Sequence, residues 1–446
     1  MPGHTRAHCT SRMEPLLQHQ AAADPERLPT FTPALVNMFK AVFGTGLLAM
    51  PYACVQVGLT SALILTGVVG VWCVYTMVLI AESVRLANAS GYNTKAERVT
   101  TFGELVTVAL GPTLGAVLGT ANLMMHQLLV CAAYLVFVGD NVAQVFGVEA
   151  VSVIIVVTPP YALLCCLRDM RLLGPTSAAG TAILFVVLVA VLWDGYSSGY
   201  ARGPPLPRHT VPSVSSLASF LGVGLFTFAG HTEVVPVVCS MGADAPRFRV
   251  IAAALLFFGV PAIGLFSVAA AAAFGLGTPQ NIMLALHSEQ GSLLKLLISL
   301  AAFFSLPVKM FPAVATVERL VLQPDGPAWL RTLVCVGLAA SSAMLAITLP
   351  DFGFMVACIG AFCNGLMSFV LPPAMILALG GAEASSASRA AHVLLFVLGA
   401  LVTVAATVKV VAEKLAAEPA AMAGARAAGR ALVEPWGGQS DAEIIF

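Results

Sequence analysis

Two stretches of the sequence place glycine and polar residues inside runs that are otherwise apolar. In the first, Phe39 to Pro51 (FKAVFGTGLLAMP), Gly44 and Gly46 flank Thr45. Glycine lowers helix stability by about 1 kcal/mol relative to alanine, so this stretch predicts an interruption in a helix. Within a membrane, unwound backbone persists only where it is buried in protein or lines a wet cavity.

The second stretch, Phe226 to Pro236 (FTFAGHTEVVP), carries Gly230, His231 and Glu233 near its middle. A helix that restarts after a break directs free N–H groups and the positive end of its dipole at the break, where a carboxylate can bind without a buried arginine. Free carbonyl groups of the preceding half can receive an ammonium group. Two such breaks suit a zwitterion. The alternative is that the glycines only let helices pack closely.

Ionisable and hydroxyl side chains near the breaks are candidates for holding an ion or moving a proton. Lys40 lies one turn before Gly44, where it either reaches the aqueous surface or places a fixed positive charge beside the break. His231 and Glu233 are candidates for a proton relay, because histidine titrates near neutrality; Glu233 can instead pair with a loop arginine. Ser305 can ligate sodium or bond to its own helix backbone.

A site of this kind requires that the residues at the two breaks lie on helices that cross a membrane. Of the 446 residues, 59% are hydrophobic and 10% charged, whereas a soluble domain carries about 25% charged residues because water must wet its surface. Apolar runs long enough to cross a bilayer occur near 33–56, 61–83, 113–145, 148–167, 172–193, 215–240, 250–275, 292–321, 332–349, 352–379 and 391–411. The sequence therefore predicts an all-α integral membrane protein with about eleven transmembrane helices in a lipid bilayer.

Charge and motifs argue against other classes of protein. Lysine and arginine number 22, as do aspartate and glutamate, so no nucleic-acid partner is indicated. The sequence has no HExxH, GxSxG or GK[ST] motif and no soluble domain to hold a cofactor, so an enzyme is not expected. Nine of the ten cysteines lie in apolar runs without CxxC spacing, and we interpret them as buried side chains, not as metal ligands.

The basic residues of the loops orient the spans, because cytosolic loops carry an excess of lysine and arginine. With the N-terminus in the cytosol, ten basic residues fall in inner loops and three in outer loops. The inner ones are Arg85, Lys95, Arg98, Arg168, Arg171, Arg247, Arg249, Arg319, Arg331 and Arg389, and the outer ones are Arg202, Arg208 and Lys295. In this topology residues 1–30 form a disordered cytosolic tail without a signal peptide, residues 413–446 form an extracytosolic tail, and the glycosylation sequon at Asn88 stays unmodified.

The two breaks fall in the first and sixth predicted spans. Inverted repeats place broken helices at corresponding positions around a site at the membrane midplane. We therefore predict a transmembrane domain over residues 31–412, with one repeat over about 33–193, a second over about 215–380, and an extra helix over about 391–411.

Five segments, in this order along the chain, resemble the amino acid/auxin permease family of the amino acid–polyamine–organocation superfamily. They are Asn37–Pro51 (NMFKAVFGTGLLAMP), Thr101–Asn141 with TFGEL and YLVFVGDN, Arg168–Pro175 (RDMRLLGP), Gly230–Pro236 (GHTEVVP) and Leu306–Arg319 (LPVKMFPAVATVER). The resemblance covers roughly residues 31–380. It implies a LeuT-like fold with inverted repeats of five plus five helices and one extra, and transport of amino acids driven by protons or sodium, without a cofactor.

By this resemblance, the first break contacts the carboxylate of the amino acid substrate, and the second lies beside its amino group and side chain. The substrate-binding residues are then Gly44, Thr45, Gly46 and Leu47, with Phe226, Phe228, Ala229 and Gly230, and either Phe226 or Phe228 is a candidate lid. The coupling ion or proton relay is expected at Asn37, Lys40, His231, Glu233 and Ser305.

The resemblance leaves the coupling ion open. Lys40 and the GDN motif are similar to the proton-coupled branch, whereas His231 and Glu233 are similar to the sodium-coupled neutral branch and to vacuolar relatives. An ammonium beside the first break replaces the charge of a sodium ion, so a proton-driven transporter with alternating access is our first hypothesis. A sodium-coupled neutral amino acid transporter and an amino-acid sensor with little flux are the alternatives. The protein is expected in the plasma membrane or a vacuolar or lysosomal-type membrane.

Overall fold

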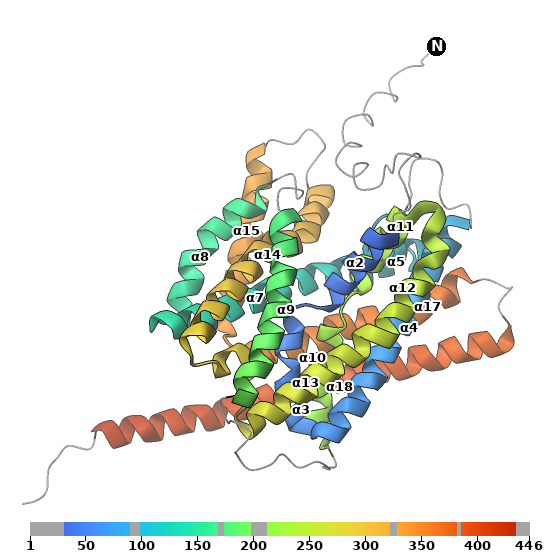
Figure 1. Cartoon of the computed structure of the whole chain (residues 1–446). Helices are drawn as coiled ribbons and strands as arrows, with labels where there is room; N and C mark the ends of the chain where they lie inside the picture. Colours follow the sequence, from blue (N-terminus) through green and yellow to red (C-terminus); the bar gives the residue numbers. More distant parts are fainter. Residues whose placement is uncertain are drawn as a thin grey trace, which may run out of the picture.

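The computed structural model describes residues 31–89, 99–167, 174–197, 212–321, 328–380 and 385–433, and this part of the chain forms helices and no β-strand (Figure 1). The α-helices are α2 (Phe31–Val42), α3 (Met50–Val57), α4 (Leu59–Ala89), α5 (Phe102–Leu110), α6 (Pro112–Leu114), α7 (Asn122–Phe146), α8 (Ala150–Cys165), α9 (Gly174–Ser197), α10 (Val214–Thr227), α11 (His231–Met241), α12 (Phe248–Ala254), α13 (Val260–Phe274), α14 (Glu289–Val321), α15 (Ala328–Thr348), α16 (Phe352–Cys358), α17 (Leu371–Leu379) and α18 (Ser386–Val433). Between them lie the 3₁₀ segments η1 (Thr45–Leu48), η5 (Gly242–Arg247), η7 (Gly275–Gly277) and η8 (Ile282–Ala285) and the π-helical segments η2 (Gly115–Ala121), η6 (Leu255–Gly259), η9 (Ile359–Asn364) and η10 (Leu366–Val370). The predicted tail over 1–30 and the basic turn from Arg168 lie outside the described residues.

Nine stretches of the described chain are long and apolar enough to cross a bilayer. One of them, Val214–Gly277, has 64 residues, which is about 96 Å of helix and about three times the thickness of the hydrocarbon core. The 3₁₀ turn η5 divides this stretch. Helix α8 is apolar but has only 16 residues. The predicted all-helical membrane architecture is confirmed, and the count of eleven spans stays a prediction.

Small residues let α10 approach α16 and η9 closely. A Cβ atom added to Gly222 would lie 2.9 Å from the Cα atom of Ala357, and one added to Gly360 would lie 3.0 Å from the backbone nitrogen of Phe226. Glycine and other small residues favour this kind of backbone contact between membrane helices, because van der Waals packing is the main force between them. The contact fixes the end of α10, where the second break begins.

Helix α18 is longer than the predicted extra helix over 391–411. It has 48 residues and continues into the residues predicted as the C-terminal tail, which begin at 413. The alanine-rich sequence from Ala416 to Arg430 explains the continuation, because alanine has the highest helix propensity of all residues. The helix runs past the rest of the bundle in Figure 1, where its end is red.

Candidate functional site

The first predicted break is present. Helix α2 ends at Val42, and the chain passes through Gly44 in an extended conformation (φ −125°, ψ −170°) before η1 begins. The first backbone bond of η1 joins the nitrogen of Leu47 to the carbonyl of Gly44 at 3.1 Å. The N–H groups of Thr45 and Gly46 come before that bond, where a helix start leaves N–H groups without an intrahelical acceptor.

The second predicted break is also present. Helix α10 ends at Thr227 and α11 begins at His231, with Gly230 as its N-cap. Phe228 and Ala229 still donate to the carbonyls of Gly224 and Phe226, at 3.0 and 3.3 Å. The series of helical hydrogen bonds of α10 ends there, and a new helix, α11, begins at His231.

The two breaks lie against each other. A Cβ atom added to Gly46 would lie 2.7 Å from Cδ1 of Phe226 and 3.0 Å from Cα of Thr227. On the other side, a Cβ atom added to Gly230 would lie 3.4 Å from Val42 and 3.6 Å from Ala41. The chain after the first break thus contacts the chain before the second break, and the chain before the first break contacts the chain after the second. This is the arrangement of two helices that run in opposite directions.

The predicted substrate residues differ in what surrounds them. Gly44 has no atom within 4 Å of an added Cβ, so it faces open space. Thr45 is buried, and its hydroxyl has no hydrogen-bond partner among the described residues. Leu47 and Phe228 are fully buried, and their contacts are those of core residues. Phe226 is 9% exposed and covers Gly46, whereas Ala229 is partly buried. The open side of the site is therefore at Gly44, next to the buried hydroxyl of Thr45.

The predicted relay of His231 and Glu233 is divided between two places. His231 is 2% exposed, and its Nε2 lies 3.0 Å from Oγ1 of Thr76 and its Nδ1 3.1 Å from Oγ of Ser368. The Thr76 hydroxyl donates to backbone carbonyls of α4, so it accepts from Nε2–H, and Nδ1 accepts from Ser368. Residues two apart on a helix do not face each other, which is why Glu233 lies elsewhere.

Glu233 acts electrostatically on two lysines. Lys40 is attracted by Glu233 and repelled by Lys309 of α14, and Lys309 is in turn attracted by Glu233. The hydroxyl of Ser305 donates to the carbonyl of Ala301 in its own helix at 2.9 Å, which is the ordinary bond of a buried serine.

Of the predicted ion residues, Asn37 is exposed on α2, away from these contacts. Sequence reasoning left Lys309 unassigned and missed Thr76, Ser368 and His126. The signal was available, because each is a polar residue inside an apolar run.

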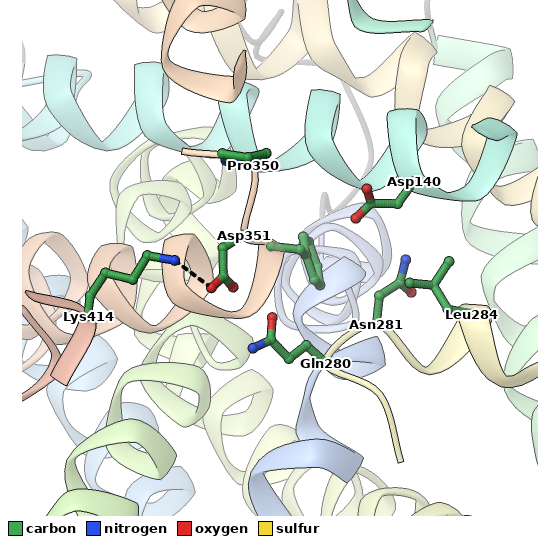
Figure 2. A pocket seen from close by; sticks show the side chains of 8 residues that line it. Asp140, Gln280, Asn281, Leu284, Pro350, Asp351 and Lys414 are labelled. Atoms are coloured by element: carbon green, nitrogen blue, oxygen red, sulfur yellow. Dashed lines mark hydrogen bonds and ion pairs between the residues drawn. The ribbon is translucent and has the colours of Figure 1, made fainter. Parts of the chain in front are cut away.

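A separate pocket of about 480 Å³ lies where α7, α16, α18 and the chain around η8 meet (Figure 2). Its wall includes Asp140, Asn281 and Asp351, and Nζ of Lys414 lies 2.9 Å from Oδ2 of Asp351. Lys414 also lies over the ring of Phe354, 5.2 Å from its centroid. The adjacent Glu413 accepts a hydrogen bond from Ser215. Helix α18 is thus fastened to the first turns of α10 and α16.

Comparison with known proteins gives this arrangement its context. Residues 29–412 match the family described as transmembrane amino acid transporter protein. Amino acid transporter AVT3A of Arabidopsis thaliana is 25% identical over 404 residues, 88% of this chain and 91% of that protein. Proton-coupled amino acid transporter-like protein pathetic of Drosophila melanogaster is 23% identical over 385 residues, 79% of this chain and 78% of that protein.

Among solved structures, a Na⁺-coupled sialic acid symporter in a substrate-bound, outward-open state is similar in fold. Its TM-score is 0.56 at 13% identity, over 89% of this chain and 92% of the symporter. This likeness concerns the arrangement of helices, and it agrees with the LeuT-like architecture that the paired breaks indicate. The family match covers most of the chain, so this protein belongs to the transmembrane amino acid transporter family, the amino acid/auxin permeases.

Proposed function

We propose that this protein is a secondary active transporter that moves amino acids across a membrane around a site at its two helix breaks. The observation that carries the proposal is the contact between the breaks: Gly46 lies against Phe226, while Gly44 faces open space. If Gly44 and Gly46 served only close helix packing, both would have near neighbours, but only Gly46 does. An open Gly44 next to free N–H groups suits a bound carboxylate.

The roles of the other groups follow from their surroundings. The N–H groups of Thr45 and Gly46 and the unpartnered hydroxyl of Thr45 would bind the substrate carboxylate. The carbonyl groups that end α10 would receive the ammonium group, and Phe226, at the edge of the site, would cover the substrate. Alternating access then requires the two half-helices on one side of the breaks to move relative to the surrounding helices.

We propose a proton as the coupling ion. A lysine ammonium about 4 Å from a sodium ion would repel it by about 4 kcal/mol at an effective dielectric constant of 20, roughly a thousandfold in affinity. Lys40 precedes the first break, and the positive charge of Lys309 in α14 acts electrostatically on Lys40. Ser305 uses its hydroxyl on its own helix. These surroundings favour a fixed positive charge over a bound metal ion.

Uptake by purified protein in liposomes tests the proposal. A panel of radiolabelled amino acids is offered with an imposed proton gradient, an imposed sodium gradient, or neither. We expect uptake of at least one amino acid, and Gly44→Leu, which fills the open space, should abolish it while the protein stays monodisperse. A protein that binds amino acids but shows no flux under any gradient would be a sensor, and the transport proposal would be wrong.

A further inference from the structure

The walls of the pocket in Figure 2 are joined by hydrogen bonds between segments far apart in the chain. Nδ2 of Asn281 donates to Oδ1 of Asn141 at 3.1 Å, which holds the chain before η8 to α7. The backbone nitrogen of Gly353 donates to Oε1 of Gln280 at 3.1 Å, which holds the same chain to α16. The volume of about 480 Å³ falls in the range of ligand pockets, about 300–1,000 Å³. The pocket thus has the size and the fixed walls of a binding site.

One carboxylate in the wall of this pocket has no counter-ion. Asp351 has two partners, because its Oδ2 pairs with Lys414 and its Oδ1 accepts the backbone N–H of Phe354. Asp140 is partly buried and lines the same pocket, yet it makes no hydrogen bond and no ion pair with any residue that the structure describes. In Figure 2 its carboxylate points toward the other lining residues. A charged group that is partly removed from water without a partner is unfavourable, so the pocket suits a ligand with a positive charge.

The pocket also has hydrogen-bond donors that its own walls do not use. Oε1 of Gln280 accepts from α16, whereas its Nε2 donates to no acceptor in the described part of the chain. The ammonium group of Lys414 has three N–H bonds, and one of them is directed to Asp351. Nδ2 of Asn141, on the amide that Asn281 holds, is buried and has no partner among the described residues. An anionic or carbonyl oxygen of a ligand could accept from these groups.

The pocket is distinct from the two helix breaks, since none of its lining residues belongs to either of them. In the predicted topology, the end of α7 and the start of α16 lie on the outer side of the membrane. Lys414 falls among the residues predicted as the extracytosolic tail. Leu284, Pro350 and Phe352 give part of the wall an apolar surface. A ligand of this pocket therefore comes from the outer solution and combines a positive group with an apolar part.

We propose that this outer pocket binds a small organic molecule through its ammonium group, with the carboxylate of Asp140 as the partner of that group. The ammonium group belongs either to an amino acid or to an amine that has no carboxylate. In an amino acid, the unused donors of Lys414 and Gln280 would bind the carboxylate. The inference goes beyond the proposed transport function, because it assigns a second site that can be occupied without transport.

Three probes that share one carbon skeleton test the proposal. They are leucine, isoamylamine, which lacks the carboxylate, and isocaproate, which lacks the ammonium group. Binding is measured by titration calorimetry on the full-length protein in detergent, with Gly44→Leu as the parent protein because this change fills the open space at the first break. We expect saturable binding of isoamylamine, and binding of isocaproate at least about tenfold weaker, the range of a charge-assisted hydrogen bond.

The comparison of leucine with isoamylamine identifies the source of the ammonium group. If leucine binds as tightly as isoamylamine or more tightly, the carboxylate contributes and the pocket is a site for amino acids. If leucine binds more weakly, the pocket is a site for amines without a carboxylate. Both results support an ammonium site. Absence of saturable binding for leucine and isoamylamine alike, or equal binding of isoamylamine and isocaproate, would overturn the proposal.

A pair of variants in the same parent protein locates the binding. Asp140→Asn should weaken the binding of isoamylamine at least about tenfold, and unchanged binding would overturn the proposal. Glu149→Gln is the matched control, because this exposed carboxylate at the start of α8 lies outside the pocket wall, and it should leave binding unchanged. If Asp140→Asn does not purify as a monodisperse protein, the comparison of isoamylamine with isocaproate decides. Absence of amino acid uptake by the wild-type protein would overturn the transport proposal and leave this site standing.

Discussion

Gly46 and Phe226 lie against each other where the two interrupted helices meet, with 2.7 Å between the ring and a Cβ atom placed on the glycine. Because the Cα of Thr227 lies 3.0 Å from the same position, backbone as well as side chain would have to move. We expect Gly46→Ala to lower the free energy of unfolding by about 1–3 kcal/mol, the usual cost of overpacking, and to reduce uptake.

The control for that change is Gly44→Ala, since Gly44 has nothing within 4 Å. It should leave the melting temperature in detergent nearly unchanged. Equal destabilisation by both substitutions would show that the two glycines have the same packing role and would contradict the open site at Gly44.

Removal of the Ser368 hydroxyl, which contacts His231, should destabilise the protein without changing the pH dependence of uptake. Ser368→Ala leaves the fully buried Nδ1 of His231 unpartnered, at a cost of about 1–3 kcal/mol, so the melting temperature should fall. Ser305→Ala, which removes a hydroxyl that donates to a carbonyl of its own helix, is the control and should have a smaller effect. A shifted pH profile of uptake in Ser368→Ala at unchanged stability would instead assign His231 to a proton relay.

Uptake by the wild-type protein should rise with an inward proton gradient and be indifferent to replacement of sodium by choline. The reason is the positive charge of Lys40, which lies one turn before Gly44, together with the positive charge of Lys309, which acts electrostatically on Lys40. The measurement is initial uptake rate in liposomes with each gradient imposed alone. Strict dependence on sodium would reject proton coupling and return Lys40 to a role at the membrane surface.

Asp351 should contribute more to stability than Lys414, although the two form one ion pair. Its Oδ1 accepts the backbone N–H of Phe354 at 2.9 Å and so caps α16, while its Oδ2 binds Lys414. Asp351→Ala removes a cap of about 1 kcal/mol in addition to the pair, whereas Lys414→Met leaves the cap in place and removes the pair and the contact over the Phe354 ring. Thermal unfolding in detergent of the two variants should give the larger loss for Asp351→Ala, and the opposite order would disprove the cap.

Asn88 should remain without glycan in a glycosylating host, because the excess of basic residues predicts that the end of α4 lies in the cytosol. Endoglycosidase treatment followed by electrophoresis checks this, with Asn88→Gln as the reference. A mobility change that the reference lacks would invert the predicted topology.

The sequence alone determined the class of protein and the positions of both breaks. Apolar runs of about 20 residues form membrane helices, because few other structures satisfy their backbone groups in lipid. Gly44 and Gly230 weaken a helix through their own low helix propensity, whatever the tertiary contacts are. The boundary of α18 could not be read in this way, because alanine-rich helix continues past the apolar run. Local propensity thus predicted where helices break better than where the last one ends.

The tertiary structure decided which polar residues act together, because each pairing joins segments far apart in the chain. His231 meets Thr76 and Ser368, whereas Glu233, two residues further on, acts electrostatically on Lys40 and Lys309. Residues two apart on a helix point to different sides. Gly44 and Gly46 look alike in sequence, yet one faces open space and the other faces Phe226. Spacing along the chain fixes the direction of a side chain on its own helix, but only the packing of the other helices determines what it meets there.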